Sequence, residues 1–280
     1  MDQINLSAWI NRSEISTGGV SDIAAQTAHA VLGKSRSQAP REGDALPALW
    51  HWFGFPPTAS MEHLGADGHP KLGGFMPPVR LNRRMWAGGA LEFMAPLHVG
   101  EHLTRETRIA NVVEKSGAAG EMVFVTLEHD ISGENGLAVR EQQDIVYLQI
   151  PDSFRAPKVI PAPQDDLRET ASITTPLLFR YSAITFNAHR IHYDLPYTQQ
   201  VEHYPDLVVH GPLQANLLMD LATRRRGRAP SMFSFRGVHP VFASDAVELS
   251  ATKTSDAEWS LCTIAGDSHQ GMQASAIWEI

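Results

Sequence analysis

The feature that most constrains the fold is a series of strand-like segments joined by short turns. In residues 122–131 the apolar Val123, Val125 and Leu127 alternate with polar neighbours, which is the period-two pattern of a half-buried strand. Short connections that contain glycine or proline join this segment to three similar ones, at 85–93, 101–113 and 137–150. Because such connections join antiparallel neighbours, these residues predict an antiparallel meander.

The C-terminal half has the pattern of one helix followed by a second set of strands. We expect a strand at 176–182 and a helix from about Gly211, in which Leu213, Leu217 and Leu221 line one side. Four strand candidates follow, at 232–241, 246–254, 258–264 and 272–280. The last of these alternates, and it places on one face Met272, Ala274, Ala276, Trp278 and Ile280. This order is expected when a curled sheet wraps around a helix.

The N-terminal half also places a helix ahead of its strands. Residues 17–33 carry apolar side chains at helical spacing, with Ser21 or Asp22 as the N-cap and Gly33 at the end. Helices ahead of strands favour an α+β fold over a parallel doubly wound sheet. Two such halves in one chain predict a double hotdog, in which two tandem antiparallel sheets each wrap around a helix.

Two proline-rich stretches organise the chain. Residues 151–175 carry prolines among charged residues, and we expect them to link an N-terminal domain (1–150) to a C-terminal domain (176–280). Residues 40–78 form a long irregular stretch, and a loop of that length in a compact domain is usually a functional or covering segment.

Composition excludes several classes of protein. The net charge of −8 argues against nucleic acid as the main partner, and no apolar run is long enough to span a membrane. The first residues do not resemble an export signal. A single cysteine, Cys262, excludes an internal disulfide and fits a reducing compartment, so we expect a cytoplasmic protein.

Two basic clusters depart from the acidic average. One spans residues 80–84, and the other contains Arg224, Arg225, Arg226 and Arg228. Each is too short for a nucleic-acid-binding face. Either could hold the phosphates of a nucleotide-containing thioester carrier, and either could equally be a solvated loop or helix end.

The segment 187–194 combines groups suited to chemistry. His192 titrates in a range that suits proton transfer near neutral pH. Asn187 could orient a water or the substrate through its amide, but it cannot exchange a proton as a carboxylate does. Asp194 could orient His192 or cap the following turn, whereas His189 and Arg190 could face away. A lone histidine is more often a packing residue, but several polar types converge here between apolar segments.

The sequence His210-Gly211-Pro212-Leu213 has the pattern of a helix start. Gly211 permits close backbone approach, and Pro212 suits the first turn but has no N–H. The N–H groups of Gly211 and Leu213 are therefore candidate donors to a thioester oxygen, with His210 in support. They would stabilise the enolate formed when water adds to an α,β-unsaturated thioester. An ordinary strand-to-helix turn has the same pattern.

Together these segments resemble the MaoC-like hydratase/dehydratase family, whose signature is Asp-x-Asn-Pro-(Ile/Leu)-His-x-Asp. His192 and Asp194 match this signature, and Asn187 stands where the family usually has aspartate. Pro77-Pro78 and the sequence RRMWAGG at residues 83–89 resemble one branch of the family. That branch contains mitochondrial 3-hydroxyacyl-thioester dehydratase and the mesaconyl-C4-CoA and itaconyl-CoA hydratases, and its N-terminal hotdog half is degenerate.

The resemblance implies reversible addition of water to an enoyl thioester. His192 would be the general base for water and could also protonate C2, while Asn187 would position the water. The degenerate half would cover the acyl group with substrate-binding residues, for which the candidates are Arg83, Arg84, Trp86 and Arg190. An arginine there could pair with a distal carboxylate, which suits itaconyl-CoA or mesaconyl-C4-CoA and would give citramalyl-CoA. No metal, and no cofactor beyond the CoA of the substrate, is expected.

Three other functions stay open at this point. The first is a 3-hydroxyacyl-thioester dehydratase of fatty-acid synthesis, although the acidic net charge argues against an acidic carrier protein. The second is a non-catalytic acyl-CoA-binding protein. The third is a hotdog thioesterase, although the helix from Gly211 to Leu218 lacks the carboxylate that such enzymes need. A homodimer is the usual family expectation, but two hotdog halves in one chain also allow a monomer.

Overall fold

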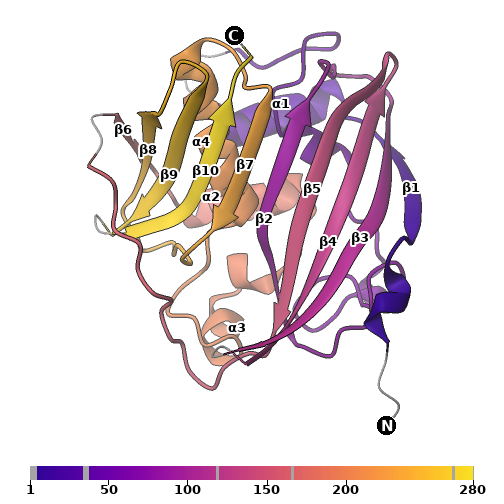
Figure 1. Cartoon of the computed structure of the whole chain (residues 1–280), viewed down its shortest axis with the longest axis vertical. Helices are drawn as coiled ribbons and strands as arrows, with labels where there is room; N and C mark the ends of the chain where they lie inside the picture. Colours follow the sequence, from indigo (N-terminus) through magenta and orange to yellow (C-terminus); the bar gives the residue numbers. More distant parts are fainter. Residues whose placement is uncertain (1–4, 34–37, 118–119, 165–166, 267–268, 280) are drawn as a thin grey trace.

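A computed structural model describes residues 5–33, 38–117, 120–164, 167–266 and 269–279. These residues form one antiparallel sheet with the strand order β1-β3-β4-β5-β2-β7-β10-β9-β8-β6 (Figure 1). The N-terminal half supplies β1 (Ser13–Gly18), β2 (Arg83–Phe93), β3 (Leu103–Gly117), β4 (Gly120–Gly133) and β5 (Gly136–Leu148). The C-terminal half supplies β6 (Arg168–Ala171), β7 (Met232–Gly237), β8 (Val247–Lys253), β9 (Glu258–Ala265) and β10 (His269–Ile277).

Within these described ranges, four α-helices and four short 3-10 turns accompany the sheet. The α-helices are α1 (Asp22–Leu32), α2 (Thr175–Ile184), α3 (Leu195–Gln200) and α4 (Gly211–Arg226). The 3-10 turns are η1 (Leu6–Trp9), η2 (Trp50–Gly54), η3 (Met61–His63) and η4 (Arg190–His192). No helix among the residues described above is both long and apolar enough to cross a membrane.

The two halves share the sheet through β2 and β7. These strands pair antiparallel from Gly88 opposite Arg236 to Glu92 opposite Met232. A Cβ atom at Gly88 would lie 2.6 Å from the Phe235 carbonyl oxygen, so glycine is what lets the two backbones approach here. The predicted halves are therefore joined edge to edge.

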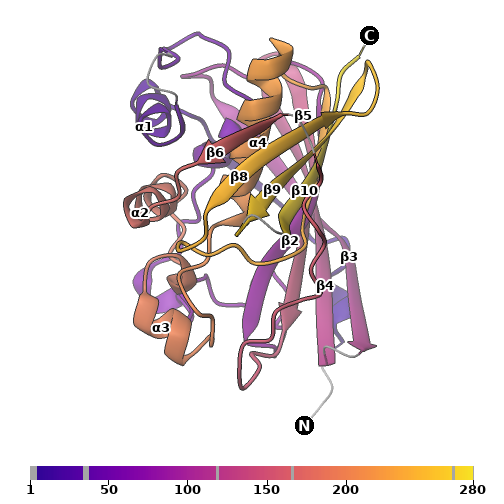
Figure 2. The same cartoon turned by 90° about the vertical axis from the view of Figure 1, so that its left-hand side faces the viewer.

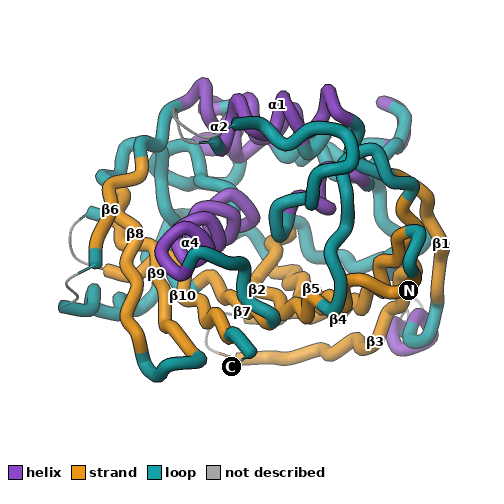
Figure 3. Tube along the Cα trace, turned by 90° about the horizontal axis from the view of Figure 1, so that it is seen from above, coloured by secondary structure: helices purple, strands orange, loops and turns teal. Residues whose placement is uncertain are grey.

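Helix α4 is the centre of the C-terminal half. Leu213, Leu218 and Leu221 are fully buried, and the helix contacts β2 and every C-terminal strand from β7 to β10. Gly227, at φ 80°, ends the helix in the left-handed conformation that favours glycine. Figure 3 shows the sheet curving around α4, and Figure 2 shows α1 and α2 covering the side of α4 away from the sheet.

The N-terminal half lacks an equivalent central helix in the part of the chain that the structure describes. Loops lie over the concave face of β3, β4 and β5 (Figure 3). Leu49 and Phe55, at the ends of η2, enter the same core cluster as α4. The expectation that each half wraps around a helix therefore holds only for the C-terminal half, and the expected degenerate N-terminal half is observed.

Most of the expected elements are present. All four N-terminal strand segments, the helix capped by Ser21, the helix from Gly211 and the four C-terminal strands are confirmed. The predicted alternation in the last strand is also confirmed, since Met272, Ala274, Ala276 and Trp278 are all buried. Ile280, the last residue of that prediction, lies outside the described residues. The short strand β6 lies inside the predicted linker and pairs with β8.

The strand predicted at 176–182 is wrong, because this segment is helix α2. Thr174 caps the helix by accepting a hydrogen bond from the Leu177 N–H, and Pro176 occupies the first turn. Leu178 and Tyr181, three residues apart, are buried on one face, which is helical spacing. A short apolar run does not distinguish a strand from a helix by its hydrophobicity, and here the cap and the proline decide.

Candidate active site

A cavity of about 840 Å³ lies where the start of α4 meets β2 and the loop after β7. Both halves of the chain line it. Five of the polar lining residues are considered below for the chemistry, and they are His69, Arg84, Asn187, His189 and His192. Two of them, His69 and Arg84, come from the N-terminal half.

His192 is held as a neutral base. Its Nδ1 lies 2.7 Å from the Val208 carbonyl oxygen, and because a carbonyl only accepts, Nδ1 carries the hydrogen. In the neutral ring, Nε2 is then the unprotonated nitrogen. Burial lowers the pKa of His192 to about 4, although the Val208 carbonyl acts in the opposite direction. At neutral pH the ring is uncharged and able to accept a proton.

His210 supports the ring of His192 from one side. The two rings stack with centroids 3.6 Å apart and planes 19° apart. His210 Nε2 lies 2.8 Å from Ser182 Oγ of α2, and the side chain is fully buried. This stack fixes the plane of the His192 ring.

Asn187 uses its amide oxygen locally. Its Oδ1 accepts a hydrogen bond of 2.9 Å from the His189 backbone N–H. The backbone N–H of Asn187 donates to the Ser182 carbonyl oxygen. The side chain lines the cavity, and Nδ2 is left as the group able to donate to a ligand. Asn187 is therefore placed to position a water or substrate oxygen and has no proton to exchange.

Asp194 and Arg190 bind each other. The Asp194 carboxylate caps α3 by accepting from the Tyr197 N–H and takes two hydrogen bonds from Arg190, at 2.8 and 2.9 Å. Of the two roles expected for Asp194, the cap is observed, and Val208 takes the other role of orienting His192. Arg190 also donates to the Ala66 carbonyl oxygen and does not line the cavity, in contrast to its expected substrate-binding position.

Arg83 and Arg84 are adjacent on β2 but differ in their partners. Buried Arg83 donates from Nε to Glu202 Oε2 at 2.7 Å, and its guanidinium lies over the Tyr204 ring at 4.4 Å. Arg84 forms no hydrogen bond or ion pair with any described residue, and its guanidinium lies 6.0 Å from the Tyr147 ring. Both line the cavity, but Arg84 is the one whose donors are available to a ligand.

Trp86, on the same strand, is fixed by aromatic neighbours. Its Nε1 donates to the Gly88 carbonyl oxygen at 2.9 Å, and its ring meets the Trp52 ring at 5.0 Å between centroids. It lines the cavity, as expected of a residue that covers the acyl group.

Gly211 opens the start of α4 to the cavity. A Cβ atom there would meet the Trp86 carbonyl oxygen at 3.7 Å and Met272 Cε at 3.9 Å, which are ordinary contacts. The fold does not require glycine at this position, and its absent side chain leaves room beside the first N–H groups of the helix. Leu213 is fully buried and does not line the cavity, so of the two expected donors only Gly211 lines it. The unpaired N–H groups at the start of α4 give this end of the helix a partial positive charge.

The cluster at 224–228 lies outside the cavity, at the C-terminal end of α4. Arg224 pairs with Asp220 at 2.7 Å and with Glu169 at 3.1 Å, and Arg225 lies 3.9 Å from Glu169. Arg226 and Arg228 donate to the carbonyl oxygens of Asp256 and Glu279. None of these four arginines lines the cavity that contains His192. The arginines that do line it are Arg83, Arg84 and Arg155.

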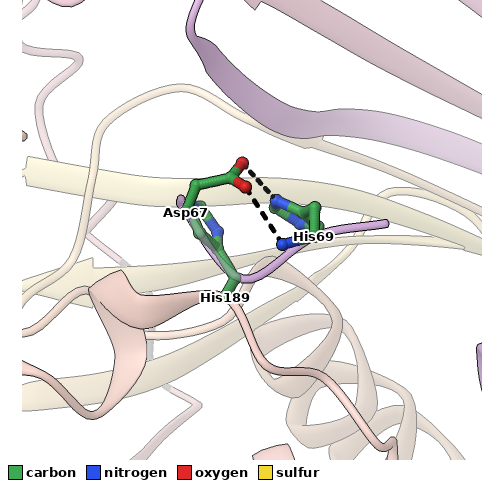
Figure 4. Close-up of side chains that lie close together, drawn as sticks. All are labelled: Asp67, His69 and His189. Atoms are coloured by element: carbon green, nitrogen blue, oxygen red, sulfur yellow. Dashed lines mark hydrogen bonds and ion pairs between the residues drawn. The ribbon is translucent and has the colours of Figure 1, made fainter. Parts of the chain in front are cut away.

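Sequence reasoning missed Asp67, His69 and the position of His189. Asp67 and His69 lie in the irregular stretch 40–78, which has no periodic pattern, and His189 does not face away but lies between His69 and His192. Figure 4 shows Asp67, His69 and His189 side by side, with Asp67 bound to His69. The sequence feature that pointed to Asp67 and His69 was the length of this stretch, since a loop of that length is usually a functional or covering segment.

Residues 49–243 match the family described as hydroxyacyl-thioester dehydratase type 2. The chain belongs to this family. Mesaconyl-C4-CoA hydratase of Chloroflexus aurantiacus is 44% identical over 244 residues, which cover 86% of this chain and 87% of that protein. The mitochondrial hydroxyacyl-thioester dehydratase type 2 of Schizosaccharomyces pombe is 26% identical, over 75% of this chain and 79% of that protein.

The fold agrees with this family membership. A Mycobacterium tuberculosis protein with a double hotdog fold superposes with a TM-score of 0.55 at 14% identity, over 96% of both chains. The predicted fold class, an α+β double hotdog, is thereby confirmed. The predicted enzyme class is confirmed as well, since the family and the relatives are named hydratases and dehydratases of thioesters.

Proposed function

We propose that the protein hydrates a short dicarboxylic enoyl-CoA, with mesaconyl-C4-CoA as the preferred substrate and citramalyl-CoA as the product. The similarity to mesaconyl-C4-CoA hydratase supports this substrate, and itaconyl-CoA is the alternative of the same class. The double bond of mesaconyl-C4-CoA is conjugated with its thioester, as the chemistry at α4 requires. The observation that carries the proposal is that His192, a neutral base, and Gly211, at a helix N-terminus, line one cavity.

The proposed reaction begins with removal of a proton from water. His192 Nε2 takes this proton as the oxygen adds to the β carbon, and Asn187 Nδ2 holds the water. The electron pair of the double bond moves onto the thioester oxygen. The N–H group of Gly211 and the positive end of α4 stabilise the resulting enolate. Protonation of the α carbon then completes the addition.

The carboxylate of the substrate requires a cation, and Arg84 fits this role. Arg84 lines the cavity, and its guanidinium forms no hydrogen bond or ion pair with any described residue. Arg83 was an equal candidate in the sequence, but its guanidinium is bound to Glu202. The proposed reaction needs no cofactor beyond the CoA of the substrate. A homodimer and a cytoplasmic location remain predictions, the latter from the single cysteine of the chain.

A second candidate is dehydration of a 3-hydroxyacyl thioester with a longer, uncharged acyl chain. The family description and the relative from Schizosaccharomyces pombe favour it. The same residues would run the reaction in reverse, so the acyl group is what distinguishes the two candidates. Arg84 in the cavity favours the dicarboxylic substrate.

The test is a substrate panel that follows the enoyl-thioester absorbance. We expect turnover of mesaconyl-C4-CoA at a kcat/KM above that for itaconyl-CoA, crotonyl-CoA and a medium-chain 3-hydroxyacyl-CoA. His192→Ala should lower kcat by about 100-fold or more, because a positioned base typically contributes that much. His63→Ala, on the exposed side of the N-terminal half, is the matched control and should keep the full rate. Turnover of none of these thioesters would refute the proposal.

A further inference from the structure

The proposed hydration moves a proton from water to the α carbon, and His192 is poorly suited to hold that proton alone. Its ring is buried, its pKa is lowered to about 4, and its Nδ1 partner is a carbonyl oxygen rather than a carboxylate. Asn187 cannot accept the proton. A protonated His192 would therefore be a buried cation without a counter-charge, which costs free energy.

A carboxylate–histidine pair comes from the N-terminal half. Asp67 Oδ2 lies 2.8 Å from His69 Nδ1, and Asp67 Oδ1 accepts the His69 N–H at 3.0 Å. A carboxylate that holds Nδ1–H of a histidine stabilises the imidazolium and leaves Nε2 to exchange a proton, as in hydrolase triads. His69 lines the cavity, and its Nδ1 is the ring nitrogen that Asp67 binds.

The His189 ring has the ring of His69, from the Asp67–His69 pair, and the ring of His192 as neighbours. The His69 and His189 ring centroids are 4.2 Å apart, and those of His189 and His192 are 5.3 Å apart. His189 is buried, and its Nε2 has no hydrogen-bond partner among the described residues. An unpaired buried nitrogen between two other rings is a cost to stability that a role in proton transfer would explain.

The loop that carries Asp67 and His69 packs against residues 188–190, which precede His192 in the chain. The Arg190 N–H donates to the Asp67 carbonyl oxygen at 2.9 Å, and Arg190 Nη1 donates to the Ala66 carbonyl oxygen at 3.1 Å. Gly68 has φ +92°, and a Cβ atom there would lie 1.8 Å from the Ala188 carbonyl oxygen. Only glycine allows this approach, so the loop is held at a defined position against residues 188–190.

From this geometry, and given the proposed hydratase function, we propose that His69, positioned by Asp67, is the second proton-transfer residue of the reaction. His192 Nε2 takes one proton from water as the C–O bond forms and the double-bond electron pair moves to the thioester oxygen. His192 then releases this proton to solvent in the cavity, His69 Nε2 takes up a proton from the same solvent, and Asp67 neutralises the imidazolium. His69 Nε2 then gives the proton to the α carbon as the enolate electron pair forms the C–H bond. All three histidines end the cycle neutral.

A metal ion is a poorer fit to the same cluster, although a nitrogen or oxygen of each of Asp67, His69 and His189 lies within 4.8 Å of the others. Both oxygens of Asp67 are already bound to His69. Arg84 acts electrostatically on both His69 and Asp67, and its positive charge would repel a divalent cation.

The decisive experiment separates proton transfer at the α carbon from addition of water. The probe is the saturated analogue of the substrate, methylsuccinyl-C4-CoA, whose α C–H exchanges with deuterium in D2O without any hydration step. We expect wild-type protein to catalyse this exchange, His192→Gln to retain it while losing hydration, and His69→Gln to lose both. The loss of kcat for hydration in His69→Gln should be about 100-fold or more with little change in KM.

Asp67→Asn tests the positioning role through the pH profile. Burial and the charge of Arg84 lower the pKa of His69, whereas Asp67 raises it; His189, His192 and Arg84 are the other titratable or charged groups near the ring. Loss of the carboxylate should lower kcat and lower the apparent pKa in the kcat profile. His63→Gln, in the same N-terminal stretch but with an exposed side chain, should change neither quantity.

Three results would overturn this role. They are full α-hydrogen exchange by His69→Gln, an unchanged pH profile in Asp67→Asn, and a stoichiometric divalent ion whose removal abolishes activity and whose return restores it. If the wild-type protein hydrates no enoyl thioester, the proposed function itself fails. An active wild-type enzyme with a silent His69→Gln substitution refutes only the role of His69.

Discussion

Adjacent side chains in this site have different functions because their partners differ. Arg83 and Arg84 follow each other on β2, and the sequence offers no basis for choosing between them. Arg83 is 6% exposed and bound to Glu202, whereas Arg84 has no hydrogen-bond or ion-pair partner among the described residues. An unpaired guanidinium in a cavity can bind a carboxylate bidentately. We therefore expect the two residues to respond to substitution in different ways.

Arg84→Ala should impair catalysis selectively. A charge-assisted hydrogen bond to the substrate carboxylate contributes about 1.5–3 kcal/mol, so kcat/KM for mesaconyl-C4-CoA should fall by about 10- to 100-fold. Crotonyl-CoA lacks the carboxylate and should be hydrated at a nearly unchanged rate by the same variant. Arg80→Ala, an exposed arginine of the same cluster, serves as the control. Equal losses for both substrates would exclude Arg84 as the carboxylate-binding residue.

At the level of elements, β2 connects the site to the rest of the fold. One edge of this strand pairs with β5 and the other with β7, and Arg83 at its start reaches the segment after α3 through Glu202. Burial raises the pKa of Glu202, and the charge of Arg83 opposes that effect. A buried ion pair is costly to break, because the remaining charge is left without a counter-charge.

Arg83→Met should destabilise the protein by about 3–5 kcal/mol, as expected when one partner of a buried pair is removed. Adding Glu202→Gln should recover part of this loss, because it removes the uncompensated charge. Arg224→Met breaks a surface pair with Asp220 instead and should cost about 1 kcal/mol or less. Urea denaturation measures all three. A loss in Arg83→Met no larger than that in Arg224→Met would mean that the pair does not stabilise the fold.

At the level of the whole molecule, the histidines that line the cavity belong to a larger set of buried neutral histidines. Burial lowers the pKa of His129 and of His192 to about 4, and it lowers the pKa values of His189 and His210 well below their usual range. In the unfolded chain each of these groups titrates near its ordinary value of about 6.5. Between these two pH values the unfolded state binds more protons than the folded state.

Stability should therefore fall as the pH is lowered from about 6.5 to about 4. A shift of this size in one histidine corresponds to about 3 kcal/mol over that interval, and the stability from this source is complete above the upper value. Urea midpoints measured across this range test the expectation. His63→Ala, at an exposed position, should not change the slope, whereas His129→Leu should reduce it. A midpoint that stays constant from pH 6.5 to 4 would contradict the neutral state of these histidines.

Patterns of residues close together in the chain were sufficient to predict most of the helices and strands. They also predicted the part of the site that comes from the C-terminal half. Alternation over Val123–Leu127 and the Gly-Pro start of α4 report local geometry directly, and the spacing from Asn187 to His192 carries the family signature. The error at α2 arose because five apolar or aromatic residues in a short run fit either secondary structure, and only the Thr174 cap and Pro176 distinguish them.

The sequence by itself therefore determined the fold class and the family, and it singled out His192 as the candidate base, because these depend on patterns of residues close together in the chain. Only the tertiary structure decided that Arg84 rather than Arg83 is available, that Val208 orients His192 and that Asp67 and His69 join the site. These outcomes depend on contacts between distant segments: Arg83 lies 119 residues before Glu202, and Arg190 donates to a carbonyl oxygen 124 residues earlier. No local pattern encodes such a contact, since it forms only when the loop from the N-terminal half packs against the C-terminal site.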